Sequence, residues 1–379
     1  MASRDVVCPF CFAQCSVRVD GDSYEPQACP RCDSYIPEES LTSELFPVAV
    51  VGPSRCGKTH FLTVLAHQMV EEVVWPTYWS GTRVVRSAAA EDGGESFDRP
   101  SDDDFVNFEE WLYPQRGAGR ILGQTERRSS ERLPLSLVMH ISYETGGQNR
   151  RKEPRKKRDL LVALTDTAGE DLLRTGWNDI VNKYPILGSG LAKGLIALVD
   201  PAELARVREE IGDTEKDPLA AERYARQGVE LKVKATLESV LAIPQIRKRM
   251  RNRPLAVCLA KCDALVERRR IDPQDVLASP AGALFRDDGL DGLIDVGAVA
   301  DISERTEAFL SEMNGRNTIS KAASLFKYRA FFAIDALGSA ISTAKTVGED
   351  RVIMRSPNPR RVLDPLLYLL WQYGLVGGR

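Results

Sequence analysis

The stretch Gly52-Pro53-Ser54-Arg55-Cys56-Gly57-Lys58-Thr59 decides the fold class of this chain. It matches the pattern G-x-x-x-x-G-K-[ST], and it lies between the apolar run 47–51 and a helix-like stretch at 60–70. A loop of this kind turns successive backbone N–H groups toward a phosphate at a helix N-terminus. Lys58 adds a positive charge for the β- and γ-phosphates, and the Thr59 hydroxyl can bind Mg²⁺. A chance match in a turn is the alternative, but the strand-loop-helix order favours a nucleotide-binding P-loop.

A second phosphate-site element follows the apolar run 160–164 and reads Thr165-Asp166-Thr167-Ala168-Gly169-Glu170. A carboxylate at the end of a buried strand is the Walker-B arrangement, in which Asp166 reaches the Mg²⁺ shell through water. The small Ala168 and Gly169 would let the backbone approach the γ-phosphate closely and withdraw after hydrolysis. A buried strand that runs into an ordinary turn explains the apolar residues but not the Asp-Thr-Ala-Gly sequence. We therefore expect Gly169 to sense the γ-phosphate.

Two further strand ends carry candidate base-recognition residues. The apolar run 255–259 leads into Ala260-Lys261-Cys262-Asp263, and the run 328–334 leads into Asp335-Ala336-Leu337. In this order the motifs resemble those of the Ras-like GTPases of the translation-factor-related P-loop class, which carry [NT]-K-x-D and S-A-[LK]. The resemblance implies that Lys261 covers the base and that Asp263 selects guanine by accepting from N1–H and N2–H₂. It also implies that Ala336, followed by Leu337, offers a backbone N–H to guanine O6.

The resemblance covers most of residues 45–379 and implies a Ras-like GTPase domain with insertions at about 76–130, 202–250 and 265–325. Strands that alternate with helices predict an α/β fold with a doubly wound, mainly parallel sheet and the nucleotide at the carboxyl edge of the strands. The other elements expected from the apolar pattern are a strand at 195–199, helices at 222–241, 304–313 and 362–371, and a Gly- and Asp-rich loop at 282–301.

Three positions depart from the family pattern. Ala260 occupies the place of an Asn or Thr whose side chain ties the base loop to the P-loop, so we expect weaker nucleotide affinity. Glu170 stands where Ras-like proteins have the Gln that orients the attacking water. A carboxylate there would be repelled by the γ-phosphate, so we expect slow hydrolysis. Ser54 replaces a frequent Gly, and the neighbouring Arg55 either acts on phosphate charge in cis or lies exposed at the loop apex.

Spacing does not fix the threonine of the first switch, which would bind Mg²⁺ and the γ-phosphate. The span between the P-loop and Asp166 is much longer than in a minimal GTPase of this class. The run 135–141 reads as the strand before the Walker-B strand, and Thr125 is the best match just upstream of it. Thr82 and Ser129 are alternatives, and an ordinary loop threonine explains Thr125 equally well.

The N-terminal segment contains two C-P-x-C sequences, Cys8-Pro-Phe-Cys11 and Cys29-Pro-Arg-Cys32. Each places two thiolates on one tight turn, and two such turns can close a tetrahedral zinc site. A segment of about 40 residues has too little core to fold alone, so zinc would supply the missing stability. The alternative, a thioredoxin-like redox motif, requires a βαβ context that this segment lacks. We therefore predict a zinc ribbon at 1–40 and interpret Cys15 as a spare thiol.

Composition supports one large domain and one small one. The chain has 379 residues, of which 43% are hydrophobic and 28% charged, with a formal net charge of −3. No apolar run approaches the ~18 residues that a membrane span needs, and the first residues lack the apolar core of a signal peptide, so a cytoplasmic location is expected. The near-neutral charge argues against a general nucleic-acid binder, and we expect the ribbon to contact a protein or to brace its neighbour.

Charge is segregated in two tracts, an acidic one at 91–110 and a basic one at 150–158. The basic tract should form the turn between the strand at 135–141 and the Walker-B strand. It is either a contact for a phosphate backbone or an acidic partner, or a solvated hairpin tip, and the two tracts could also meet between protomers.

The motifs together favour a GTP-binding molecular switch that binds GTP or GDP with Mg²⁺, carries structural Zn²⁺ and hydrolyses GTP slowly. Ribbon, GTPase domain and the apolar terminal helix loosely resemble the double-GTPase proteins of bacterial conflict systems. That resemblance implies a protein partner, either a second GTPase or an effector, in a defence module. The alternatives are a nucleotide-binding scaffold that never hydrolyses, an ATPase or P-loop kinase, and a ribbon-led nucleic-acid adaptor.

Overall fold

The computed structural model describes residues 2–21, 23–53, 56–69, 79–84, 119–120, 136–145, 156–167, 184–188, 190–201, 204, 206–207, 237–238, 244–267, 294–338, 345–347, 350–353 and 357–377, which we call the described residues. Among them, no helix combines the length and the apolar composition that crossing a bilayer requires.

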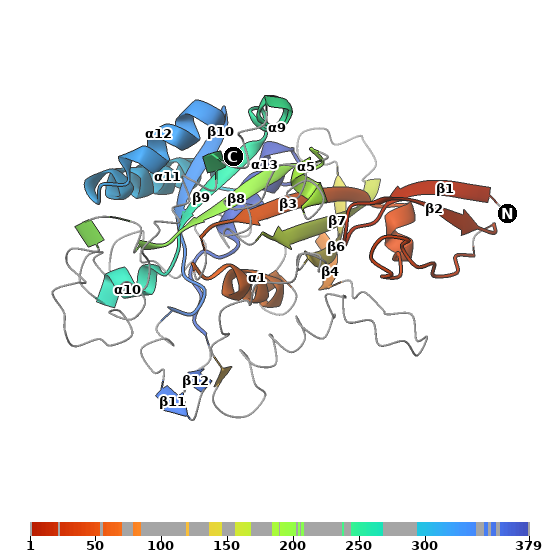
Figure 1. Cartoon of the computed structure of the whole chain (residues 1–379), viewed down its shortest axis with the longest axis horizontal. Helices are drawn as coiled ribbons and strands as arrows, with labels where there is room; N and C mark the ends of the chain where they lie inside the picture. The colour runs from red at the N-terminus through yellow and green to blue at the C-terminus, as the bar shows by residue number, and fades with distance from the viewer. Residues whose placement is uncertain are drawn as a thin grey trace.

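A seven-stranded sheet forms the centre of the molecule, with the strand order β10-β9-β8-β3-β7-β6-β4 (Figure 1). All neighbours from β10 to β7 are parallel, and β6 and β4 extend the sheet with antiparallel pairs. The strands are β3 (Glu44–Val51), β4 (Trp79–Val84), β6 (Ser136–Thr145), β7 (Lys156–Asp166), β8 (Gly194–Val199), β9 (Pro254–Leu259) and β10 (Tyr328–Ala333). The predicted α/β fold with a mainly parallel sheet is confirmed.

Strand β3 is the point where the order of the sheet reverses. The strands that follow β3 in the chain, up to its parallel neighbour β7, lie on one side of it. The next strand, β8, pairs with β3 on the other side. In open α/β sheets, a crevice opens at the carboxyl ends of the strands at such a switch point, and ligands bind there. The P-loop sequence begins at this end of β3, directly after Val51.

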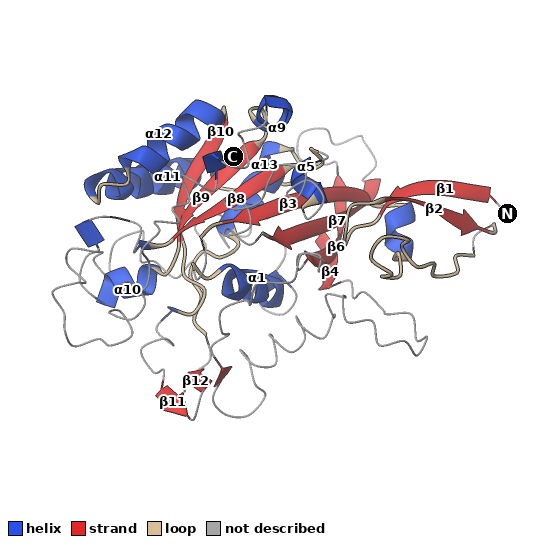
Figure 2. Ribbon diagram, in the orientation of Figure 1, coloured by secondary structure: helices blue, strands red, loops and turns tan. Residues whose placement is uncertain are grey.

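Helices lie on both sides of the sheet (Figure 2), and alternate residues of the parallel strands belong to two separate apolar clusters. Val48 and Val50 of β3 pack with α1 (Lys58–His67) and α13 (Asp364–Gln372). Ala49 and Val51 belong to the opposite cluster, which includes residues of α5 (Pro185–Gly188) and α12 (Arg316–Leu325). Because both faces of the sheet are covered, the central strands appear in the sequence as continuous apolar runs, and their positions could therefore be predicted.

The helix α11 (Val296–Glu312) begins earlier than the sequence indicated. We expected a loop at 282–301, but residues 296–301 are helical. The Asp295 side chain accepts a hydrogen bond of 2.9 Å from the Ala298 backbone N–H and thereby caps the first turn. Asp in a Gly- and Asp-rich stretch signals a loop and a helix cap equally well, so composition alone placed the boundary too late. The expected helix at 222–241 lies outside the described residues, apart from 237–238.

The remaining elements are short. They are the strands β1 (Ala2–Val7), β2 (Gln14–Val19), β5 (Gly119–Arg120), β11 (Lys345–Val347) and β12 (Asp350–Ile353), the 3₁₀ helix η1 (Glu38–Leu41), and the helices α9 (Pro244–Met250) and α10 (Cys262–Glu267). The β1–β2 hairpin lies at one end of the molecule, beyond the start of β3 (Figure 1). Val17 of β2 and Ile36, which follows the hairpin, are buried in the same apolar cluster as Tyr184, so the N-terminal segment packs on the sheet domain.

The C-terminal helix α13 places an acidic side chain in the interior. Asp364 is 1% exposed, and among the described residues neither of its carboxylate oxygens has a hydrogen-bond partner. Burial raises the pKa of Asp364 to about 7, and the nearby Arg361 opposes this effect. Because the folded-state pKa lies above the unfolded value near 4, the contribution of Asp364 to stability is complete below pH ~4 and is lost as pH rises through about 7.

Replacing Asp364 by Asn should therefore flatten the pH dependence of stability. The thermal midpoint of the wild type should fall relative to that of D364N as pH rises from 5 to 8, because only the wild type must ionise a buried carboxyl. Asp301→Asn alters an exposed carboxylate on α11 and should leave the wild-type profile unchanged. Parallel profiles for wild type and D364N would show that the carboxyl does not titrate in this range.

Candidate nucleotide site and cysteine cluster

The loops that carry the predicted site are joined by backbone hydrogen bonds beyond the ends of the strands. Val199 of β8 lies opposite Leu259 of β9, which lies opposite Ala333 of β10. The next residues continue the ladder: Ala260 N–H donates to the Val199 carbonyl at 2.9 Å, and Ile334 N–H donates to the Leu259 carbonyl at 2.8 Å. Three loops that are distant in sequence therefore leave the sheet side by side, next to the P-loop.

The P-loop requires glycine at its first position. A Cβ atom on Gly52 would lie 2.8 Å from the Cys56 Sγ and 2.9 Å from the Leu198 carbonyl oxygen, closer than van der Waals contact allows. Gly57 has a φ of 96°, in the left-handed region, and its carbonyl accepts from Phe61 N–H in the first turn of α1. Two of the predicted cup residues, Ser54 and Arg55, lie outside the described residues.

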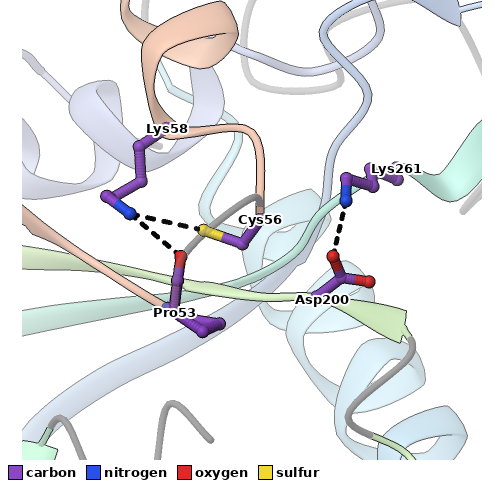
Figure 3. Close-up of polar contacts among 5 residues, drawn as sticks. All are labelled: Pro53, Cys56, Lys58, Asp200 and Lys261. Carbon is purple, nitrogen blue, oxygen red and sulfur yellow. Dashed lines mark hydrogen bonds and ion pairs between the residues drawn. The ribbon is translucent and has the colours of Figure 1, made fainter. Parts of the chain in front are cut away.

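Lys58 points into its own loop (Figure 3). Its Nζ donates to the carbonyl oxygens of Gly52 at 3.1 Å and Pro53 at 2.9 Å, and it lies 4.0 Å from the Cys56 Sγ. The side chain is buried. A buried ammonium group enclosed by backbone carbonyls at a helix N-terminus is a positive centre suited to an anion.

Thr59 and Asp166 meet across the strand ends. The Thr59 hydroxyl donates to the Asp166 Oδ2 at 3.3 Å, and both side chains are buried. Thr167 fixes the end of β7 against β3, because its N–H and its hydroxyl both donate to the Val50 carbonyl. A hydroxyl and a carboxylate oxygen held together are hard oxygen donors of the kind that Mg²⁺ prefers. The two residues therefore fit the predicted magnesium site.

The loop 260–263, which carries the predicted base-recognition residues and which we call the base loop, lies beside the P-loop. A Cβ on Gly57 would be 3.9 Å from the Cε of Lys261, so the end of the Lys261 stem lies beside this glycine. Lys261 has a left-handed backbone with φ 54°, and its Nζ forms a 2.5 Å ion pair with the Asp200 Oδ2 (Figure 3). Asp263 is buried in the first turn of α10.

The loop after β10 is organised by its own carboxylate. Asp335 Oδ1 accepts from the Leu337 N–H at 3.2 Å and from the Gly338 N–H at 2.8 Å. Burial raises the pKa of Asp335 to about 6, and the bond from Gly338 opposes the shift. Ala336, the predicted donor to guanine O6, lies in the chain between Asp335 and the two residues whose N–H groups bind the Asp335 carboxylate. The conformation of this loop is therefore fixed by hydrogen bonds between its own residues.

The structure brings most of the predicted nucleotide-site residues to one edge of the sheet, namely Gly52, Pro53, Cys56, Gly57, Lys58, Thr59, Asp166, Lys261, Asp263, Ala336 and Leu337. The predicted residues Gly169, Glu170 and Thr125 lie outside the described residues, as does Ser129. Thr82 lies in β4, on an antiparallel edge strand. Sequence reasoning missed Asp200, although its place directly after a buried strand is the same signal that singled out Asp166.

The four predicted zinc ligands form one cluster at the N-terminus. The Sγ atoms of Cys8, Cys11, Cys29 and Cys32 all lie within 4.8 Å of one another, and all four residues are buried free cysteines. Cys8 and Cys32 are 3.7 Å apart, and Cys11 and Cys29 are 3.5 Å apart. A tetrahedral site with Zn–S bonds of ~2.3 Å requires sulfur–sulfur distances of about 3.8 Å. The cluster therefore fits zinc.

The two C-P-x-C turns have the same backbone hydrogen bonds. Phe12 N–H donates to the Cys8 carbonyl, and Asp33 N–H donates to the Cys29 carbonyl, both at 2.8 Å. Phe12 and Asp33 also share a left-handed backbone, with φ of 60° and 55°. Each turn thus closes four residues after its first cysteine, which directs two thiols to one side. The fifth thiol, Cys15, lies 3.6 Å from Cys29 but does not belong to the set of four that surrounds one point.

Comparison with known proteins gave matches among solved structures alone, because no family model and no curated protein matches the sequence. The chain is similar to the signal recognition particle receptor SRb-GTP/SRX complex from Chaetomium thermophilum, with 13% identity and a TM-score of 0.29, over 78% of this chain and 93% of that chain. It is also similar to the cytosolic domain of the T. maritima FeoB iron transporter in its apo form, with 10% identity and a TM-score of 0.22. That match covers 60% of this chain and 49% of the transporter chain.

Replacing Cys29 by Ser should remove zinc and destabilise the protein, because a site with three thiolates binds zinc less tightly and zinc binding is coupled to folding of this segment. Native mass spectrometry should show one zinc ion per wild-type chain and none on C29S, and the thermal midpoint of C29S should be lower. Cys15→Ser is the matched control and should keep its zinc. Loss of zinc from C15S, or a wild type without zinc, would contradict the assignment.

Proposed function

We propose that this protein is a molecular switch that binds GTP or GDP together with Mg²⁺. The observation that carries the proposal is the proximity of the two loops: the Cε of Lys261 in the predicted base motif lies 3.9 Å from where a Cβ on Gly57 of the P-loop would be. These residues are 204 positions apart (261 − 57), and their proximity supports a site in which one loop would bind the phosphates and the other the base. The cup of N–H groups would bind the β-phosphate, and the base would lie along the Lys261 stem.

The phosphate end of the site supports this proposal through charge. On nucleotide binding, Lys58 would exchange the Gly52 and Pro53 carbonyls for phosphate oxygens, which are stronger partners because they are charged. Thr59 and Asp166 would hold Mg²⁺, which neutralises phosphate charge when bound. The γ-phosphate sensors, Gly169 and the threonine of the first switch, remain proposals from the sequence.

The base end supports guanine through its pattern of donors and acceptors. The Asp263 carboxylate can accept two hydrogen bonds and donates none when ionised, so it matches the adjacent N1–H and N2–H₂ groups of guanine. Adenine presents an acceptor at N1 and would leave the carboxylate without a donor there. The Ala336 amide would then donate to O6, from a loop that Asp335 already holds in shape.

Hydrolysis in this proposal is slow, because Glu170 replaces the glutamine that orients water in the family that the chain resembles. A non-hydrolysing scaffold is the second candidate, motivated by the carboxylate of Glu170 in place of that glutamine and by the buried methyl group of Ala260, which cannot tie the base loop to the P-loop. Phosphate release in a single turnover, alone and with candidate partners, separates the two. A protein partner, the cytoplasmic location and a role in a bacterial defence module rest on the sequence alone.

Lys58→Ala should weaken binding of GDP about 10- to 100-fold, because one charged group that hydrogen-bonds to phosphate is worth ~1.5–3 kcal/mol. Fluorescence titration with N-methylanthraniloyl-GDP in the presence of Mg²⁺ measures the effect. Lys321→Ala removes a lysine that pairs with Glu238 on the surface, and it should bind like the wild type. Equal affinity of K58A and wild type would contradict a phosphate role for Lys58.

Asp263→Asn should change the preferred base. An amide presents one acceptor and one donor, so guanine loses a partner for one N–H group, whereas xanthine carries a carbonyl at position 2 that the amide can donate to. Competition among GDP, xanthosine diphosphate and ADP should show wild type preferring GDP and D263N preferring xanthosine diphosphate. Preference of the wild type for ADP would overturn the guanine assignment and favour an ATPase or kinase.

A further inference from the structure

Asp200 belongs to none of the nucleotide motifs, yet it contacts the base loop. It follows directly after the last residue of β8, and its carboxylate forms the 2.5 Å ion pair with the Lys261 Nζ (Figure 3). The Asp200 side chain is 16% exposed, and that of Lys261 is 32% exposed. An ion pair that is largely withdrawn from solvent is screened less than a surface pair, so this contact is strong enough to fix a side chain.

The position of Asp200 follows from the register of the sheet. Val199 and Leu259 lie opposite each other, and the ladder continues through the hydrogen bond from Ala260 N–H to the Val199 carbonyl. The residues that come next on the two chains, Asp200 and Lys261, therefore emerge side by side from neighbouring strands. Any change of strand order would separate them.

Both the backbone and the ammonium group of Lys261 are held by contacts. Its left-handed backbone is disfavoured for a residue with a side chain, and it is held by hydrogen bonds of the flanking Ala260 and Cys262 amides. Its four-carbon stem is flexible, so a free lysine would sample many rotamers. Asp200 fixes the ammonium end, and the stem then lies beside the P-loop, with its Cε 3.9 Å from where a Cβ on Gly57 would be.

We propose that Asp200 is a positioning residue for the nucleotide base, acting through Lys261. With both ends of Lys261 held, its stem is an apolar platform formed before the purine binds, which lowers the ordering cost of binding. This inference rests on the proposed function and adds a fifth strand end, that of β8, to the site. Because the stem covers the face of the ring, Asp200 sets affinity for the purine in general, whereas Asp263 reads its edge.

The test is a double-mutant cycle with Asp200→Asn and Lys261→Met, measured by titration and by stopped-flow release of N-methylanthraniloyl-GDP. D200N should weaken GDP binding about tenfold, mainly through faster release, because a charge-assisted contact is lost. In the K261M background, D200N should have no further effect, because the residue that it positions is absent. An equal loss in both backgrounds would show that Asp200 acts only on the fold, and tighter binding by D200N would show that the ion pair withholds Lys261 from the base.

A second comparison separates recognition of the face of the purine ring from recognition of its edge. D200N should weaken GDP and inosine diphosphate by the same factor, because the two bases differ only in the 2-amino group. D263N should weaken GDP more than inosine diphosphate. A loss by D200N that is confined to GDP would overturn the platform role.

Two further variants serve as controls. Asp200→Glu keeps the charge and should retain most of the affinity, and Glu238→Gln breaks an exposed ion pair elsewhere and should have no effect. If wild type binds GDP and D200N binds it equally well, the Asp200 inference fails alone. If wild type binds neither GDP nor ADP, the proposed function fails and the inference falls with it.

Discussion

The register of the parallel strands is the constraint on which the rest of the structure depends. Five strands run in one direction from β7 to β10, so their carboxyl ends meet at one edge of the sheet. Neighbouring strands lie ~4.8 Å apart, and each loop therefore leaves the sheet one strand spacing from the next. Asp166, the P-loop, Asp200 and the loop 260–263 occupy successive places along this edge. No loop could find its partners if one strand were shifted.

Much of this arrangement could be read from the sequence, and the reason is burial. Strands covered on both faces appear as unbroken apolar runs, and a polar residue directly after such a run marks the edge where ligands bind. Asp166 was predicted in this way, whereas Asp263 was predicted from the resemblance of residues 260–263 to the [NT]-K-x-D motif. Asp200 carries the same signal, but its partner could not be predicted, because the pairing of Asp200 with Lys261 depends on which strands are neighbours. The early start of α11 was missed because a single side-chain cap at Asp295 outweighs loop-like composition.

The two candidate sites lie at opposite ends of one strand. The cysteine cluster precedes the start of β3, and the P-loop follows its end. Eight residues of extended chain span about 26 Å, so the cysteine thiols do not take part in binding at the carboxyl edge. The segment instead adds Val17 and Ile36 to the apolar cluster on one face of the sheet. Fixing the cysteine turns with zinc would therefore brace the domain at its amino-terminal edge.

The phosphate end and the base end of the proposed site differ in how much they must change. Lys58 already uses the Gly52 and Pro53 carbonyls and has to release them before it can bind phosphate. Lys261 forms an ion pair with Asp200, and the Asp335 loop is closed by its own amides, so both would be formed before a nucleotide binds. Rearrangement is thereby concentrated where the γ-phosphate would lie. A switch requires this division, because the signal must come from the phosphate while the base holds the nucleotide in place.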